Sequence, residues 1–464
     1  MLQARTAAAV AVVTMTSLIP YSLFINAHEY FYYKLRNATD LSIVDDNNLL
    51  RAMYDPYRNN ATLGTEPTTD LQRTYEGWFT VTSGITCILG SLVNTVATNR
   101  LSNSFRVVAG HAIVLLALMP TLFYTFIDTD DDQAHFFWMS MLFSSISSFA
   151  SVGLIGAGIQ GLAATLSASY VKVVMLASAT ANIATSVLSI VCQAATSSSI
   201  LNGRIYFGIA FLWTILSLLC YLFLLPSEHA KEIDERSEDD EPLVDDKDDE
   251  EEDETEGSVV SDNSPREDNQ EISSRPQTES PSSEASSASL FDGWPRILEQ
   301  SGPDLACTMF IIIVTCAAYP ALVSQVRTQT LNATWRAYFS SICCFLLYSC
   351  SDGLGRIFAM RINISRRHLQ NLSLARLLLL PLIAVCDVQP RHHSPTLIRN
   401  DAVFVLLNMT LALSFGFCYT HAYVKAVQSV EPELREKTGS MLSLTGNVVG
   451  LIGNLMGVAI VTFV

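Results

Sequence analysis

Residues 135–166 read HFFWMSMLFSSISSFASVGLIGAGIQGLAATL, a stretch without Asp, Glu, Lys or Arg. No acidic residue occurs between Gln133 and Ser227. A soluble protein exposes too much surface to omit carboxylates for so long. A helix that faces lipid must omit them, because a charge at the centre of a bilayer costs about 3 kcal/mol or more. The stretch therefore predicts a membrane protein.

Ten further stretches have the same character, which makes eleven in all. Each approaches or exceeds the roughly 20 mostly apolar residues that a helix needs to cross a hydrocarbon core about 30 Å thick. Together they predict an all-α membrane protein with eleven transmembrane helices in a 6+5 arrangement. The fourth is too long for one straight span and should tilt or continue beyond the membrane. The stretches are residues 6–27, 77–98, 105–127, 135–166, 171–195, 204–225, 302–326, 335–358, 368–388, 402–424 and 438–464.

The net charge of −17 belongs to one insert and not to the whole chain. Residues 227–290 hold 24 acidic and 5 basic residues, which leaves 21 acidic and 23 basic residues elsewhere. The sequence thus divides into a six-helix bundle at 1–226, a disordered acidic cytoplasmic linker at 227–295 and a five-helix bundle at 296–464. Serines beside acids in the linker resemble kinase sites, so kinases are candidate partners. No basic face favours nucleic acid as a partner.

Orientation follows from glycosylation sequons more than from charge. Asn37, Asn60 and Asn332 each begin an Asn-Ala-Thr sequon, and all three fall outside if the N-terminus is cytoplasmic. The basic segment RINISRRH at 361–368 then lies inside. We expect an integral protein of the plasma membrane with an extracellular C-terminus. A signal peptide at the first stretch is the alternative, although its apolar character continues too far for a short signal core.

The segment GAGIQG at 156–161 matches the GxGxxG pattern of dinucleotide sites. It lacks the preceding strand and the downstream acid that such a site requires. Small residues in a membrane helix instead allow close approach of backbones, and the same holds for Gly446, Gly450, Gly453 and Gly457. No cofactor and no metal site is expected, since Cys343, Cys344 and Cys350 lack a partnering pair at ligand spacing.

Asp352 and Arg356 lie four residues apart in SDGLGR, inside the eighth stretch. This spacing puts both side chains on one helix face, and neither can face lipid cheaply. A carboxylate beside a guanidinium could hold the hydroxyls of a sugar, while the two charges neutralise each other in the empty site. A structural ion pair and a gating element like the Asp-Gly-Arg motif of major facilitator transporters are the alternatives.

Three more polar residues are candidates for function. Gln160 offers both a donor and an acceptor, which suits the edge of a nucleobase, but it could equally bond to a neighbouring helix. His28 and Glu29, at the outer end of the first stretch, could relay protons or close a gate. The simpler interpretation of His28 and Glu29 is a solvated pair at the membrane interface.

Taken together, these segments resemble the equilibrative nucleoside transporter family over nearly the whole chain except the insert. The resemblance is carried by LIPYSLFINAHEYF at 18–31, GIQGLAATLSASY at 158–170, SDGLGR at 351–356 and SFGFCYTHAYVKA at 414–426. It implies a two-bundle architecture like that of major facilitator carriers, with a central site reached alternately from each side.

The resemblance also implies roles for individual residues. Gln160 would contact the nucleobase, and Asp352 with Arg356 would engage the ribose hydroxyls. Leu18, Tyr21 and Ile25, on one face of the first helix, would line the pocket. The chain departs from mammalian relatives at Tyr21-Ser22, where they have Trp-Asn, and at Leu162, where they have Ser. These departures concern inhibitor binding and substrate preference more than fold.

The expected function is therefore facilitative transport of nucleosides, with nucleobases as a further candidate cargo, by alternating access across a lipid bilayer. A proton-coupled nucleoside or nucleobase symporter is the main alternative, with protons as a further partner. An organic-cation carrier of the same family is less favoured, because residues 171–195 hold no acidic residue. An enzyme is not expected, since intramembrane catalysis needs paired catalytic groups on facing helices.

Overall fold

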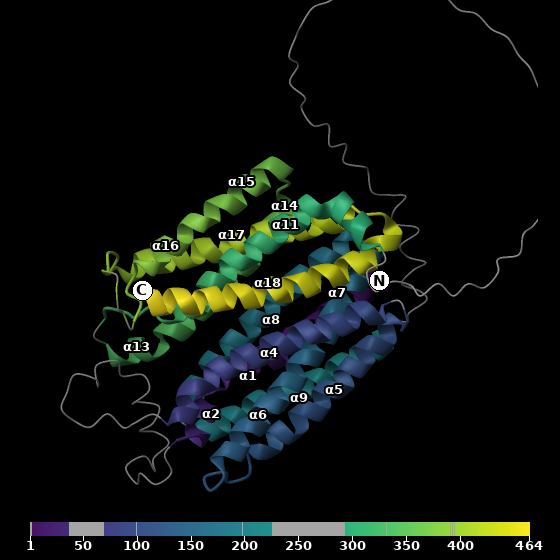
Figure 1. Ribbon diagram of the computed structural model, residues 1–464. Helices are drawn as coiled ribbons and strands as arrows, with labels where there is room; N and C mark the ends of the chain where they lie inside the picture. Colours follow the sequence, from purple (N-terminus) through teal and green to yellow (C-terminus); the bar gives the residue numbers. More distant parts are fainter. Residues whose placement is uncertain are drawn as a thin grey trace, which may run out of the picture.

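The protein is a bundle of long helices that run roughly side by side (Figure 1). The computed structural model describes residues 2–36, 69–224 and 293–464, except 99, 197, 331, 390, 392 and 394. Asn37, Asn60 and the acidic insert lie outside these residues. The N-terminal half consists of α1 (Leu2–Asn26), α2 (His28–Lys34), α4 (Asp70–Ala97), α5 (Asn103–Tyr124), α6 (Gln133–Ser148), η3 (Phe149–Gly156), α7 (Ala157–Leu166), α8 (Ala168–Ala195) and α9 (Ser199–Leu224).

The C-terminal half lies beside the N-terminal half, and the two chain termini lie at opposite ends of the bundle (Figure 1). Its elements are α11 (Trp294–Ala318), α12 (Ala321–Ser324), α13 (Ala333–Phe339), η4 (Ser340–Leu346), α14 (Leu347–Arg361), α15 (Arg366–Ala375), η5 (Arg376–Leu378), α16 (Leu379–Ala384), α17 (Asp401–Gln428), η6 (Pro432–Leu434) and α18 (Arg435–Phe463).

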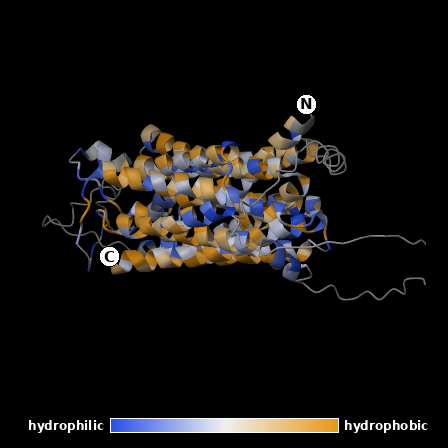
Figure 2. Ribbon diagram, turned by 90° about the horizontal axis from the view of Figure 1, so that it is seen from above, coloured by the Kyte–Doolittle hydropathy of each residue, from blue (hydrophilic) through white to orange (hydrophobic). Residues whose placement is uncertain are grey.

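Polar caps fix where many of these helices begin. Thr69 accepts a hydrogen bond from the Gln72 backbone in a capping box at the start of α4. Ser, Asp and Asn side chains cap α5, α6, α13, α15 and α17 in the same way. Asn332, the third sequon residue, is the cap of α13, where its side chain accepts from the Trp335 backbone. Figure 2 shows that hydrophilic residues gather at the two ends of the helices, while their long middle parts are mostly hydrophobic.

Ten helices in the described ranges are long and apolar enough to cross a membrane. The expectation of an all-α membrane protein is confirmed. The stretch predicted at 368–388 is not one continuous α-helix and is not among the ten. It divides into α15, η5 and α16, with the 3-10 segment beginning at Arg376. An average hydropathy over this stretch does not reveal the buried arginine at which the 3-10 segment begins.

The fourth span, predicted at 135–166, runs from Gln133 to Leu166 as one long rod. Its central part, η3, is a π-helix, and the eighth span contains a second one, η4. π-Helical segments are rare and often lie beside functional sites. Here η3 ends four residues before Gln160, and η4 ends six residues before Asp352. Both predicted site segments therefore follow a local widening of their helix.

The largest core cluster contains residues of both halves. Ala163 and Met175 from the N-terminal half share this cluster with Tyr423 and Met441 from the C-terminal half. α7 packs against α18, and α8 packs against α14, so these four elements form much of the contact between the halves. A second cluster, which includes Tyr348 and Phe404, lies wholly in the C-terminal half.

Glycines allow several of these helices to touch, as predicted for α18, but only at some positions. A Cβ atom on Gly453 would lie 2.7 Å from the Cys316 Cβ, and one on Gly457 would lie 2.8 Å from the Ala317 carbonyl oxygen. At Gly450 the nearest atoms are 4.0 Å away. Only Gly453 and Gly457 therefore bring the backbones of α11 and α18 together.

We expect Gly453→Ala to lower the free energy of unfolding by about 1–3 kcal/mol, because the added methyl group overlaps α11. Gly450→Ala is the matched control, since it has the same helix propensity change and open space around it. The midpoint of thermal unfolding in detergent measures both variants. Equal midpoints would contradict the close contact at Gly453.

Candidate functional site

Asp352 and Arg356 form a buried ion pair in the middle of α14. Arg356 Nε donates to Asp352 Oδ1 at 2.9 Å, and the two residues are 4% and 1% exposed. The four-residue spacing on one helix turn brings them together, as predicted from SDGLGR. Gly416 of α17 holds the other side of Asp352, because any Cβ at Gly416 would overlap the Asp352 carbonyl oxygen. The pair is thus fixed between α14 and α17.

Arg356 also reaches the other half of the molecule. Its Nη1 donates to the Met175 carbonyl oxygen of α8 at 2.8 Å. In the described part of the chain, neither Arg356 Nη2 nor Asp352 Oδ2 makes a hydrogen bond. The pair therefore lies at the contact between the two halves.

A second buried arginine, Arg376, lies in η5 and was not identified from the sequence. Its guanidinium donates to the hydroxyl groups of Thr315 and Ser414 at 2.6 and 3.0 Å, and to the Ile311 carbonyl at 3.2 Å. No carboxylate within the described ranges pairs with it. A single cation within an apolar stretch, at ARLLLL, was the signal that could have indicated it.

Gln160 lies in α7 and is joined to the ion pair through aromatic residues of α17. The Tyr423 hydroxyl donates to Gln160 Oε1 at 3.0 Å. Phe415, Tyr419 and Tyr423 follow one another at four-residue spacing, with neighbouring ring centroids 5.2 and 5.9 Å apart. We call these three residues the α17 ladder. The guanidinium carbon of Arg356 lies 5.7 Å from the Phe415 centroid and 5.6 Å from the Tyr419 centroid, within range of a cation–π interaction.

The three candidates in α1 are placed differently. Leu18 and Tyr21 are half-buried, and the Tyr21 ring stacks on Phe79 of α4 at 6.1 Å. Ile25 is 41% exposed. Within the described residues, no hydrogen bond or ion pair joins these three to Asp352, Arg356 or Gln160. Their contribution to a pocket stays a prediction.

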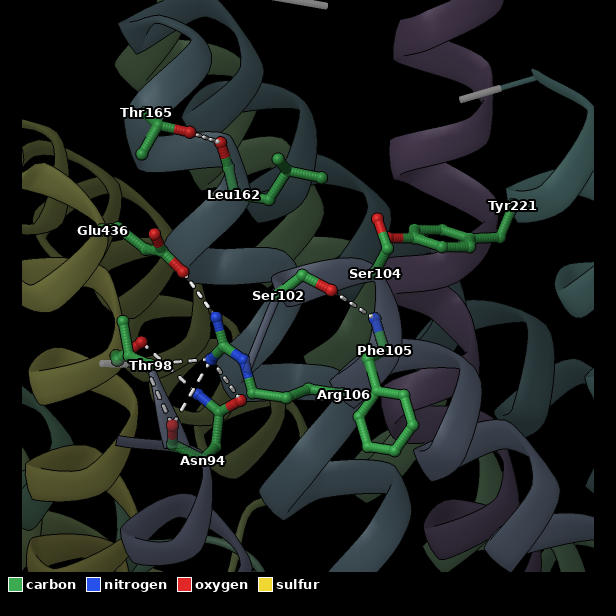
Figure 3. A network of polar contacts seen from close by, with 11 residues as sticks. Asn94, Thr98, Ser102, Ser104, Phe105, Arg106, Leu162, Thr165, Tyr221 and Glu436 are labelled. Atoms are coloured by element: carbon green, nitrogen blue, oxygen red, sulfur yellow. Dashed lines mark hydrogen bonds and ion pairs between the residues drawn. The ribbon is translucent and has the colours of Figure 1, made fainter. Parts of the chain in front are cut away.

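One end of the bundle is closed by a polar network around Arg106 of α5 (Figure 3). Arg106 Nη2 lies 2.5 Å from Glu436 of α18, and Nη1 donates to Asn94 Oδ1 at 2.7 Å and to Thr98 at 3.0 Å. Asn94 in turn donates to Ser440 of α18 at 3.4 Å. We call this the Arg106 end. The network joins the two halves there.

The opposite end carries His28 and Glu29, the predicted gate residues. Both lie in α2, where Glu29 is buried and accepts a hydrogen bond from Gln193 Nε2 at 3.4 Å. Gln193 also accepts from Ser341 of η4 at 3.3 Å, so α8 meets the C-terminal half here too. His28 instead faces the Tyr32 ring, with centroids 6.4 Å apart. The structure thus brings Glu29, but not His28, to a contact between the halves.

A buried lysine stabilises the loop beside this end. Lys34 Nζ donates to the Ile127 carbonyl oxygen at 2.5 Å, and Arg36 forms an ion pair with Asp130 at 2.7 Å. Burial lowers the pKa of the Lys34 ammonium, while the carboxylates of Asp128 and Asp130 oppose that shift. These contacts all lie within the N-terminal half, so they hold this loop without crossing to the other half.

Polar side chains gather where the two halves meet. The Asp352–Arg356 pair and the Gln160 amide lie at the contact between two halves, and polar networks join those halves at both ends. In the described ranges, no group of three His, Cys, Asp or Glu residues could hold a metal ion. A midplane site between two halves with polar contacts at each end is typical of secondary transporters.

Comparison with known proteins agrees with this geometry. A family model described as nucleoside transporter matches residues 140–462. The equilibrative nucleoside transporter 1 of Rattus norvegicus is 25% identical over 93% of this chain and 91% of its own length. The Homo sapiens protein of the same name is 24% identical over 92% of this chain and 90% of its own length.

Solved structures show the same fold. The human organic anion transporter MFSD10 aligns over 99% of this chain and 96% of its own, with 12% identity and a TM-score of 0.53. The proton:xylose symporter XylE, of the major facilitator superfamily, aligns over 97% and 94%, with 11% identity and a TM-score of 0.51. With a matching family model over most of its length and this fold, the chain belongs to the equilibrative nucleoside transporter family.

Proposed function

We propose that this protein carries nucleosides across a membrane by facilitated diffusion, with the cargo bound between its two halves. The observation that carries the proposal is the Asp352–Arg356 pair. It is buried, it lies where α14 meets α8, and it keeps one donor and one acceptor unused. Vicinal ribose hydroxyls offer the complementary donor and acceptor.

The second part of the cargo site is Gln160. The α17 ladder separates its carboxamide from Arg356, since Tyr423 bonds to Gln160 and Tyr419 lies under the Arg356 guanidinium. A molecule that engages Gln160 and Arg356 together needs a sugar at one end and a polar base at the other. A nucleoside has this form. Leu18, Tyr21 and Ile25 of α1 would supply the apolar wall beside the base, and Tyr21 already stacks on Phe79.

Alternating access requires contacts between the halves that break in turn. The Arg106–Glu436 ion pair closes one end, and the Gln193–Ser341 hydrogen bond lies at the other. We infer that the two helical bundles, 1–226 and 296–464, rock about the Asp352–Arg356 pair and release one of these contacts at a time.

We further infer eleven membrane crossings, with α15, η5 and α16 together as the ninth. The opposite positions of the two termini require an odd number of crossings (Figure 1). The Arg106 end would be cytoplasmic and the C-terminus extracellular, in the plasma membrane. Asn332 would then be available for glycosylation, together with Asn37 and Asn60. The acidic linker, with its serines, would be accessible to kinases.

Replacing the site carboxylate should abolish transport. Asp352→Asn removes the charge that balances Arg356, and leaving a buried guanidinium unpaired costs about 3–5 kcal/mol. We expect uptake of radiolabelled uridine and adenosine to fall by about 100-fold, in cells that lack their own carriers.

Asp304→Asn is the matched control for that experiment. Asp304 is also buried and pairs with an arginine, Arg366, at 2.9 Å, but Arg366 is half exposed and water can replace the lost carboxylate. Uptake by this variant should stay within about threefold of wild type. Surface biotinylation normalises both measurements. Normal uptake by Asp352→Asn at normal surface expression would remove the site assignment.

Weakening the Arg106 end should open it. Glu436→Gln removes the ion pair across the halves, worth about 1 kcal/mol, and leaves Arg106 bonded to Asn94 and Thr98. A cysteine in place of buried Ser440, in an otherwise cysteine-free chain, should react with maleimide about fivefold faster in that variant.

The control for the opening experiment is Asp130→Asn, which breaks the Arg36–Asp130 pair within the N-terminal half. It should leave the labelling rate unchanged. Equal rates in the Glu436→Gln variant and in wild type would show that this ion pair does not hold the end closed.

The proton-coupled alternative predicts a different pH dependence. Facilitated diffusion moves no proton, so uridine uptake at pH 5.5 and pH 7.5 should agree within about twofold. A strong rise at pH 5.5 that disappears in Glu29→Gln would instead favour a symporter in which Glu29, buried beside Gln193, carries the proton.

A further inference from the structure

Gln160 is held from two directions. Its backbone lies against α18, because a Cβ at Gly439 would be 2.7 Å from the Gln160 carbonyl oxygen. Its side chain is held by α17, through the hydrogen bond from Tyr423 to Oε1. Neither the position nor the rotation of this carboxamide is therefore free.

The hydrogen bond from Tyr423 also determines which end of the Gln160 amide is available to another molecule. Oε1 accepts from the Tyr423 hydroxyl, whereas Nε2 makes no hydrogen bond to any described residue. A carboxamide left alone can rotate and offer either its oxygen or its nitrogen. While Oε1 holds this bond the amide cannot flip, so the group that it presents to cargo is the Nε2 amino group, which donates.

Tyr423 is itself well placed to impose this choice. It is 1% exposed, so its hydroxyl cannot turn to water, and its ring packs against Tyr419 in the α17 ladder. A buried hydroxyl that loses its partner costs about 1–3 kcal/mol, which keeps it directed at Gln160.

We propose that Tyr423 is a positioning residue that makes Gln160 a dedicated hydrogen-bond donor, so that the carrier recognises a ring acceptor on the base. This rests on the proposed function and adds the polarity of base recognition to it. The cargo class is then nucleosides whose base presents an acceptor, such as an unprotonated ring nitrogen, towards α7.

The test removes acceptors from the cargo one at a time. Adenosine is compared with 1-deazaadenosine, 3-deazaadenosine and 7-deazaadenosine, each of which replaces one ring nitrogen by C–H. Uptake of radiolabelled adenosine and its inhibition by each analogue are measured in cells that lack their own carriers. In wild type, one analogue should bind about tenfold more weakly than adenosine.

Tyr423→Phe should reduce that discrimination to about twofold, because the freed amide can offer either end. Gln160→Leu should abolish it, and the double variant should behave like Gln160→Leu alone. Tyr221→Phe is the matched control. It also removes a buried hydroxyl bonded to a side chain, Ser104 at 3.2 Å. This bond joins α9 to α5 and does not involve Gln160, so the variant should keep the full discrimination.

Four results would overturn the proposal. In the first, Tyr423→Phe keeps the tenfold discrimination between adenosine and the deaza analogue. In the second, adding Tyr423→Phe to the Gln160→Leu variant changes the relative binding of adenosine and that analogue. All three analogues could bind wild type like adenosine, which would mean that no ring acceptor is read. If the wild-type protein carries neither adenosine nor uridine, the proposed function itself fails. That failure is seen in the wild-type uptake measurement alone, so it is distinguished from a failure of the Tyr423 proposal, which is seen only when variants are compared.

Discussion

A guanidinium inside a membrane protein must find acceptors for its donors, and Arg356 finds them in both halves of the molecule. One is Asp352 on its own helix, and the other is the Met175 carbonyl of α8. Any movement that separates α14 from α8 takes the second acceptor away. The guanidinium must then bond to water or to cargo, because an unpaired buried charge is costly. The contact between the halves is therefore also the place where we propose that cargo binds.

The helices could be predicted from the sequence because hydrocarbon imposes a simple rule on composition. A stretch such as 135–166 has no alternative to a membrane helix, and Asp352 with Arg356 is recognisable because such charges are rare in these stretches. The rule averages over about 20 residues, however, and so it could not show where a helix is interrupted. The break at η5 and the π-helices η3 and η4 depend on particular neighbours and not on average hydropathy.

The partners of the site residues were also beyond the sequence. Four-residue spacing joins Asp352 to Arg356, since both lie on one helix. It says nothing about which helix lies beside them. Tyr423 and Gln160 are 263 positions apart, and their hydrogen bond exists only because α7, α17 and α18 meet. Aromatic residues at helical spacing are usually core residues, so the segment 414–426 supported the family resemblance without indicating that its aromatic residues link Gln160 to Arg356.

Arg376 explains how the C-terminal half can move without losing the shape of its site. Its guanidinium bonds to Thr315 and Ile311 of α11 and to Ser414 of α17, which ties both helices to η5. Its carbon also lies 5.7 Å from Phe415, at the start of the α17 ladder. These three hydrogen-bonded groups, on α11 and α17, cannot leave the Arg376 guanidinium without exposing a charge to an apolar interior. The C-terminal half therefore keeps α11, α17 and the ladder together, and relative motion of the halves must act on the contacts between them, which include those at Met175, at Gln160 and at the Arg106 end.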